Sequence, residues 1–123
     1  MARTAFTAIN ARPSIMTETE FLAAAGALLA RIEEAVEATG LDADVERKGD
    51  GILELEFDNG SKIVINSQTP MRQMWVAARS GGFHFEFREN TWRDTRSGDA
   101  LFDTLSKVIS EQSGESVRLG PAA

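Results

Sequence analysis

The residues of this 123-residue sequence best suited to chemistry are carboxylates gathered in one short stretch. Six acidic side chains fall within fourteen residues, namely Glu33, Glu34, Glu37, Asp42, Asp44 and Glu46. Their oxygen atoms suit hard cations such as calcium, magnesium, manganese and ferrous iron. Like charges this close repel one another, and a bound cation or basic partner relieves the repulsion. The stretch therefore predicts a cation-binding or protein-docking surface, and the alternative is an ordinary solvated face.

Histidine occurs once in the sequence, at position 84, where the local alternation predicts an exposed side chain. A lone imidazole can serve as a labile metal ligand or as a catalytic base. Neither a serine nor a second histidine is visibly arranged around His84, so the sequence does not indicate a catalytic triad. A surface position without chemistry is the simpler interpretation, and we predict no catalytic residue.

Trp75 is the second unusual residue, because its predicted strand points it outward together with Asn66 and Gln73. An exposed tryptophan among amide side chains is typical of a protein-binding hot spot. The alternative is that a loop or the N-terminal segment covers the indole.

The first element that positions these residues is a helix predicted over residues 18–38. Thr17 and Glu20 have the spacing of a capping box, and apolar residues follow at helical spacing. Gly40 marks the helix end, since glycine accepts the left-handed conformation found there. The three glutamates of the acidic stretch then project away from the apolar stripe.

Alternating apolar and polar residues after this helix predict a run of antiparallel strands. The turn at Asp58-Asn59-Gly60 joins two of them into a hairpin, because asparagine and glycine accept positive φ. The strands are predicted at residues 45–48, 52–57, 61–66, 73–78 and 83–88 and around Trp92. The alternation places one face of the sheet in water and the other against a core.

A second amphipathic helix is predicted over about residues 99–112, with Gly114 ending it. Two such helices on one sheet face bury every apolar stripe. We therefore predict an α+β fold, a two-layer α/β sandwich with the N- and C-terminal helices packed on one face of an antiparallel sheet of about five to six strands.

Composition restricts the possible partners and chemistry. Nineteen acids against thirteen bases give a net charge of −6, which disfavours nucleic acid and membrane surfaces. The absence of cysteine excludes disulfides, thiolate nucleophiles and thiolate-held clusters. Residues 1–15 contain no acid, so composition changes near Met16. We predict an N-terminal extension at 1–15, one domain at 16–119 and a short tail at 120–123.

Several motifs together resemble the frataxin family, and within it the bacterial CyaY type. The resemblance extends from Thr17 to about Leu119. Its motifs are DNGSKIVINSQTPMRQMWVA at 58–77, GGFHF at 81–85, W-x-x-x-R-S-G at 92–98 and Q-x-G at 112–114. The acidic first helix also occupies the place where the family carries an acidic ridge.

This resemblance implies a bacterial cytoplasmic protein, a monomer, that binds ferrous or ferric iron weakly and reversibly. It further implies that the protein regulates or donates iron for iron–sulfur cluster assembly through contact with the cysteine desulfurase and the scaffold protein. The six carboxylates named above become the expected iron site. The expected partner-binding residues are Asn66, Gln68, Trp75 and His84.

Two other functions remain open at this point. One is a ferroxidase or iron-storage oligomer, although that chemistry needs a preorganised two-metal site and histidine is scarce here. The other is a protein-binding modulator whose iron binding is incidental.

Overall fold

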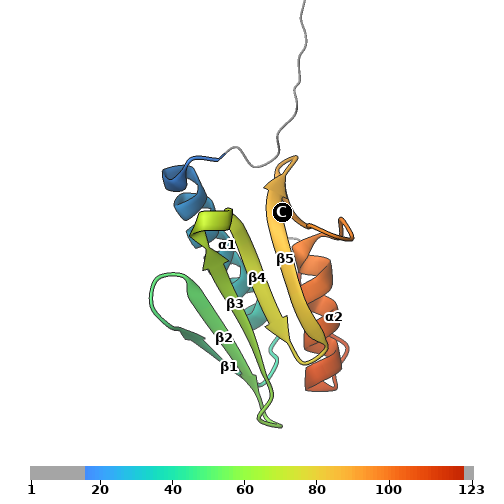
Figure 1. The fold of residues 1–123 in the computed structure, drawn as a ribbon. Coiled ribbons are helices and arrows are strands. Elements are labelled where there is room, and N and C mark those ends of the chain that lie inside the picture. Colours follow the sequence, from blue (N-terminus) through green and yellow to red (C-terminus); the bar gives the residue numbers. More distant parts are fainter. Residues whose placement is uncertain (1–15, 121–123) are drawn as a thin grey trace, which may run out of the picture.

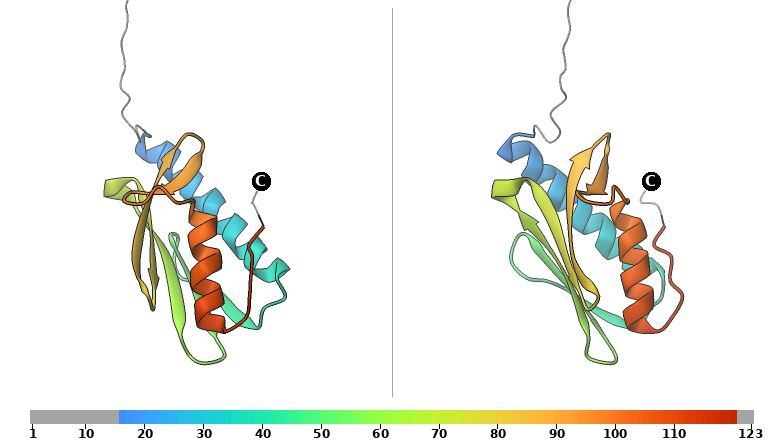
Figure 2. Two further views of the ribbon diagram at one scale, coloured as in Figure 1. Left: turned by 90° about the vertical axis from the view of Figure 1, so that its right-hand side faces the viewer. Right: turned by 45° about the vertical axis from the view of Figure 1, so that its right-hand side comes forward.

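The fold is a six-stranded antiparallel sheet with two helices on one face. The structure, a computed structural model, describes residues 16–120. Helices α1 (Glu18–Ala38) and α2 (Leu101–Ser113) lie behind the sheet in Figure 1, and Figure 2 shows the same two layers from other sides. The predicted two-layer α+β sandwich is thus confirmed.

The strands follow one another in the sheet in the order in which they occur along the chain. Each strand pairs antiparallel with the next, which leaves β1 and β6 as the two sheet edges. A single 3-10 turn, η2 (Thr69–Met71), separates the third and fourth strands. The strands are β1 (Ala43–Arg47), β2 (Ile52–Phe57), β3 (Lys62–Gln68), β4 (Gln73–Ala78), β5 (Gly81–Arg88) and β6 (Thr91–Asp94).

Helix α1 begins and ends where its sequence predicts. The Glu20 amide donates to Thr17 Oγ1 (3.1 Å) and the Thr17 amide donates to Glu20 Oε1 (2.9 Å), which confirms the capping box. At the other end Thr39 caps the helix and Gly40 has φ of 71°, in the left-handed region.

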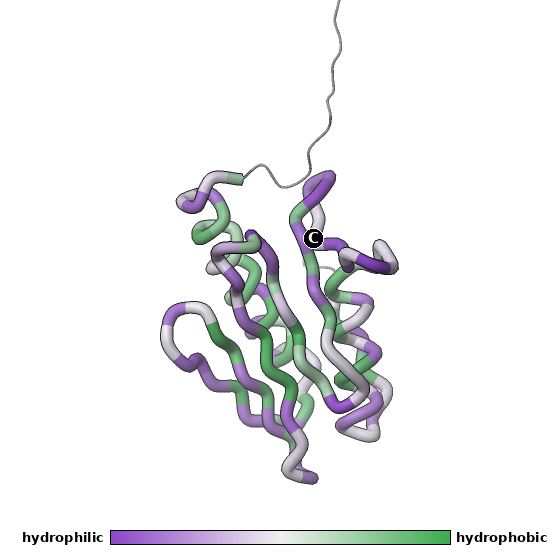
Figure 3. The backbone as a smooth tube through the Cα atoms, in the orientation of Figure 1, coloured by the Kyte–Doolittle hydropathy of each residue, from purple (hydrophilic) through white to green (hydrophobic). Residues whose placement is uncertain are grey.

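The core lies between the sheet and the helices. Hydrophobic and hydrophilic residues alternate along the strands (Figure 3), and the inward set is buried. Trp92 is only 5% exposed and packs edge-on against Phe21 of α1. Phe85 is fully buried, whereas Phe83 and Phe87 are partly exposed and pack against the core.

Several predicted boundaries were wrong by a few residues. β1 begins at Ala43 rather than at Val45, and β3 continues to Gln68 because Ser67 and Gln68 still pair with β4. α2 begins at Leu101 rather than at Asp99. There the Asp99 carbonyl oxygen accepts the Asp94 amide (2.8 Å), which keeps the chain extended through the cap residue.

The predicted domain boundaries lie near the two ends of the chain. The extension predicted at residues 1–15 lies outside the described residues. Near the other end, Leu119 is fully buried against the core, and its amide donates to Ser106 Oγ (3.0 Å). Between residues 16 and 120, neither helix has the length and apolar character needed to cross a membrane.

Candidate functional site

The acidic stretch begins on the last turns of α1. Glu34 and Glu37 are exposed there, whereas Glu33 is half-buried. The Nε atom of Arg47, on β1, lies 3.3 Å from Glu33 Oε1. This ion pair fastens the end of α1 to the edge strand, so Glu33 is less free to bind a cation than the other two glutamates.

The stretch continues on β1, where alternate residues project from the outer face of the sheet, away from the helices. Asp44 is paired in register with Glu56 of β2, and Glu46 with Glu54. Side chains directly opposite on neighbouring strands are in close proximity, and like charges in that position repel. The antiparallel pairing therefore brings acids of two strands together at this edge.

Acids at the start of β1 and at the end of β2 also line a shallow hollow of about 270 Å³. Asp42 and Asp44 line it together with Glu56 and Asp58. Sequence reasoning missed the last two residues. The alternation along residues 52–57 placed Glu56 on the polar face, but only the β1–β2 register brings it opposite Asp44.

Glu54 is the one acid of this edge that is surrounded by bases. Lys48 Nζ lies 3.3 Å and Lys62 Nζ 3.5 Å from Glu54 Oε1. Partial burial favours the protonated acid, but the hydrogen bonds and charges of the two lysines outweigh burial and hold the pKa of Glu54 below its ordinary value. Lys48 Nζ also lies 4.0 Å from Glu46 Oε1.

The remaining carboxylates of the stretch are not engaged in this way. Within residues 16–120, Glu34, Glu37, Asp42 and Asp44 form no ion pair. In the same part of the chain no three histidine or acidic side chains converge closely enough to hold a metal ion. The arrangement is an open row of separate carboxylates, which favours cations that keep most of their water.

We call this row the acidic ridge. It comprises the six predicted acids with the two that the register adds, namely Glu33, Glu34, Glu37, Asp42, Asp44, Glu46, Glu56 and Asp58.

A second cluster lies on the outer face near the middle of the sheet. The register places Asn66, Trp75 and His84 side by side on three neighbouring strands. The Trp75 and His84 rings stack with centroids 4.2 Å apart and planes 8° from parallel. The outward direction predicted for Trp75 and the exposure predicted for His84 are both confirmed.

Gln68 and Gln73 also belong to this cluster. They are paired in register two residues along β3 and β4 from Asn66 and Trp75. Gln73 Oε1 accepts a hydrogen bond from Trp75 Nε1 (2.8 Å), which fixes the indole against the sheet. The result is a preorganised aromatic platform with amides around it, as protein-binding hot spots often have. We call Asn66, Gln68, Gln73, Trp75 and His84 the aromatic platform.

Comparison with known proteins identifies the family to which this chain belongs. A family model described as the frataxin-like domain matches residues 14–115. The chain belongs to the frataxin family. The resemblance predicted from the sequence motifs is thereby confirmed.

Relatives named as iron–sulfur cluster assembly proteins align with this chain along nearly their whole length. The chain is 56% identical to the iron–sulfur cluster assembly protein CyaY of Cupriavidus pinatubonensis over 108 residues, covering 85% of this chain and 97% of that protein. Identity to the protein of the same name from Ralstonia nicotianae is also 56% over 108 residues, covering 85% and 95%.

Solved frataxin structures share the fold. Frataxin from Psychromonas ingrahamii is 39% identical and superposes with a TM-score of 0.79, covering 86% of this chain and all of that one. A trimeric frataxin from Saccharomyces cerevisiae, complexed with ferrous iron, is 28% identical with a TM-score of 0.58, covering 87% and 94%.

Proposed function

We propose that this frataxin binds iron weakly and reversibly on the acidic ridge and regulates or donates iron for iron–sulfur cluster assembly. The observation that carries the proposal is the set of exposed carboxylates along the end of α1 and the β1 edge that form no ion pair within residues 16–120, namely Glu34, Glu37, Asp42 and Asp44. Relatives that match almost end to end are named for iron–sulfur cluster assembly.

The chemistry follows from how the carboxylates are spaced. Glu34 and Glu37 lie three residues apart on one helix, and Asp44 faces Glu56 across two strands. Their mutual repulsion favours any cation that binds between them. Because no three acidic or histidine side chains converge on such an ion within residues 16–120, water completes its coordination and it exchanges readily. Weak binding of this kind suits the transfer of iron to another protein.

We further propose that the same charge docks the cysteine desulfurase through a basic patch on that enzyme. The aromatic platform would then contact the scaffold protein or the complex of the two. Acidic ridge and aromatic platform share the outer face of the sheet, since Asp44, Glu56, Trp75 and His84 all project from it. A partner lying across this face can therefore contact both.

We propose a monomer without catalytic turnover. A ferroxidase needs two metals held by bridging ligands, and the described residues bring no such group together. The trimeric yeast frataxin complexed with ferrous iron keeps an iron-storing oligomer as the competing function. Sedimentation of this protein with and without ferrous iron separates the two, because storage requires iron-dependent assembly.

Charge reversal with a matched control tests the docking role. One variant carries Glu34→Lys, Glu37→Lys and Asp42→Lys on the acidic ridge. The control carries Glu18→Lys, Glu89→Lys and Glu115→Lys, which reverses three exposed acids elsewhere and gives the same net charge. We expect the ridge variant to lose desulfurase binding and its effect on cluster formation, while the control keeps both. Equal behaviour of the two variants would refute docking at the ridge.

A further inference from the structure

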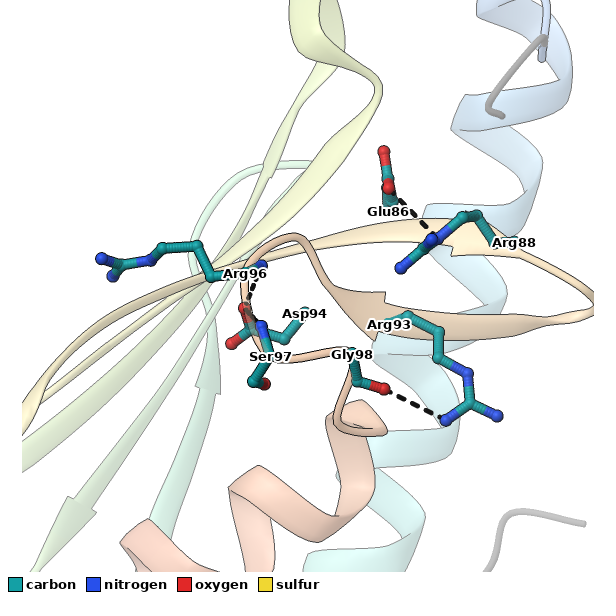
Figure 4. Close-up of polar contacts among 7 residues, drawn as sticks. All are labelled: Glu86, Arg88, Arg93, Asp94, Arg96, Ser97 and Gly98. Carbon is teal, nitrogen blue, oxygen red and sulfur yellow. Dashed lines mark hydrogen bonds and ion pairs between the residues drawn. The ribbon is translucent and has the colours of Figure 1, made fainter. Parts of the chain in front are cut away.

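The two edges of the sheet differ in what covers them. At the β6 edge the chain folds back on itself, and Arg93 forms an antiparallel bridge with Ala100. Figure 4 shows the Arg93 side chain donating to the Gly98 carbonyl oxygen (3.2 Å) of the same returning segment. At the other edge, no strand or bridge lies beyond β1 within residues 16–120 (Figure 1). The β1 edge is therefore open.

The register decides which backbone groups of β1 face the open edge. Hydrogen-bonded and non-hydrogen-bonded pairs alternate along an antiparallel ladder. The Lys48 amide donates to the Ile52 carbonyl oxygen (2.9 Å), one pair beyond the end of β1. Steps of two residues from this pair give Glu46 and Asp44 as the positions bonded to β2. The amides and carbonyls that point toward the open edge are then those of Ala43, Val45 and Arg47.

β1 keeps the regular geometry that the addition of another strand requires. A row of unpaired amides and carbonyls is a template for a further strand, and proteins commonly protect such an edge with proline, lysine or a bulge. β1 contains neither proline nor lysine. Its pairing with β2 continues residue by residue from Ala43 to Arg47, so no bulge interrupts it. An extended peptide can therefore pair along the whole strand.

Charge decides which strand this edge accepts. Asp44 and Glu46 are exposed on the outer face of β1, and Glu56 lies opposite Asp44 on β2. A second copy of this chain paired through β1 would bring the acids of both copies together, and like charges on neighbouring strands repel. A strand with lysine or arginine at alternate positions would instead place each base beside an acid. The edge therefore rejects its own copy and favours a basic segment.

The other side of β1 favours apolar residues. Ala43 and Val45 are half-buried and pack at the margin of the core. Alternate residues of an added strand would lie beside them, on the helix side of the sheet. The five residues of β1 span about 17 Å of extended chain. The ligand that fits is an extended segment of this length in which basic and apolar residues alternate.

We propose that the β1 edge binds such a basic segment of a partner protein as a seventh strand of the sheet. This mode of binding rests on the proposed docking of the partner at the acidic ridge and adds how the partner is held. Main-chain hydrogen bonds to β1 supply affinity and fix the register, while the acids of the ridge select basic side chains.

Titration of the full chain with a short blocked peptide of alternating lysine and valine tests strand addition. Hydrogen exchange at the amides of Ala43, Val45 and Arg47 should slow at least about tenfold as the peptide saturates, because these amides become hydrogen-bonded. The dissociation constant should be about 1 mM or tighter. A peptide with glutamate in place of lysine should not bind. Unchanged exchange at all three amides in the saturated complex would overturn the proposal.

Two N-methylated forms of the lysine peptide separate strand addition from charge attraction. One form carries its methyl groups on the valine amides and the other on the lysine amides, so their charge is the same. An added strand directs only alternate amides toward β1. One form should therefore bind at least about tenfold more weakly than the other. Equal binding by the two forms would contradict strand addition.

Variants of Val45 locate the hydrogen bonds in the protein. Val45→Pro removes an amide at the open edge, where proline is tolerated, and leaves every charge in place. Val45→Ala is the control, because it shortens the side chain and keeps the amide. Val45→Pro should bind the peptide and the cysteine desulfurase about tenfold more weakly than Val45→Ala. Ala43→Pro repeats the test at the first residue of β1, and unfolding midpoints show that the variants fold.

The outcomes distinguish this mode of binding from docking at the ridge. Desulfurase affinity in the proline variants equal to that of Val45→Ala would overturn strand addition. If the charge-reversed ridge variant still loses desulfurase binding in that case, docking at the ridge stands. If the ridge variant keeps its binding as well, both proposals fail.

Discussion

The two tryptophans of this chain differ in burial. Substituting each one therefore separates an effect on stability from an effect on binding. Trp92 is buried against Phe21, whereas Trp75 lies on the outer face, stacked on His84. Trp92→Ala should lower the free energy of unfolding by about 3–5 kcal/mol. Trp75→Ala should lower it by only about 1 kcal/mol, which is the loss of one aromatic stack.

The same pair of variants tests the aromatic platform. Trp75→Ala should abolish binding to the cluster-assembly partners while thermal unfolding stays close to native. Denaturant unfolding and partner binding, measured on both variants, give the answer. Full partner affinity in a folded Trp75→Ala protein would remove Trp75 from the proposed interface.

Glu54 gives stability a defined dependence on pH. Its pKa is lowered in the folded protein, so its contribution is fully present above the unfolded value of about 4.5 and is lost as pH falls through the folded value. Lys48→Met with Lys62→Met should remove that contribution. Unfolding measured from pH 7 to pH 3 should show native and variant converging at the acid end. A stability difference that stays constant across this range would contradict the role of the two lysines.

Sequence alone was sufficient for some site residues and insufficient for others. Asn66, Trp75 and His84 could be placed on one face because alternation in three strands decides direction. Glu56 and Asp58 could not be predicted as site residues, because their place beside Asp42 and Asp44 depends on the β1–β2 register. No local pattern in the sequence indicates this register.

Among the elements, α2 is tied to the sheet by one side chain near its end. Gln112 is 4% exposed, and its Oε1 accepts the Arg79 amide (2.7 Å). Its Nε2 donates to Ser61 Oγ and to the Lys62 carbonyl oxygen (3.1 Å each). These contacts join α2 to the β2–β3 turn and to the β4–β5 turn, which lie at the same end of the β3–β4 pair.

Gln112→Ala should therefore lower the free energy of unfolding by about 3 kcal/mol, because it leaves buried backbone groups without partners. Glu111→Ala, at the exposed neighbouring position, should change it by less than about 0.5 kcal/mol. Chemical denaturation of both variants measures the difference. Equal small losses would show that water replaces the amide of Gln112.

The helices and strands themselves were largely predictable, and the misses have local causes. The α1 boundaries follow from the capping box and Gly40, which are local signals. The start of α2 does not, because Asp99 is held in an extended conformation by the Asp94 amide of another segment.

At the scale of the whole molecule, repulsion among the carboxylates of the acidic ridge lowers stability, while the same carboxylates provide the proposed iron site. Glu34→Gln, Glu37→Gln and Asp42→Asn remove repulsion worth a few tenths of a kcal/mol per pair. We expect the triple variant to unfold at a higher temperature than the native protein at low salt, and the gap to narrow as salt screens the charges. Thermal unfolding at two salt concentrations measures this. A lower midpoint for the variant would mean that these carboxylates stabilise the fold.

Iron binding on the acidic ridge can be tested by an anaerobic titration with ferrous iron. Paramagnetic broadening of amide signals maps where the ion lies in the native protein and in the Glu34→Gln, Glu37→Gln, Asp42→Asn variant. The control variant Glu18→Gln, Glu89→Gln, Glu115→Gln removes the same charge elsewhere. We predict that signals from the end of α1 and from β1 disappear first, and that only the ridge variant loses this effect. Broadening that begins at His84, or that is identical in all three proteins, would contradict the claim.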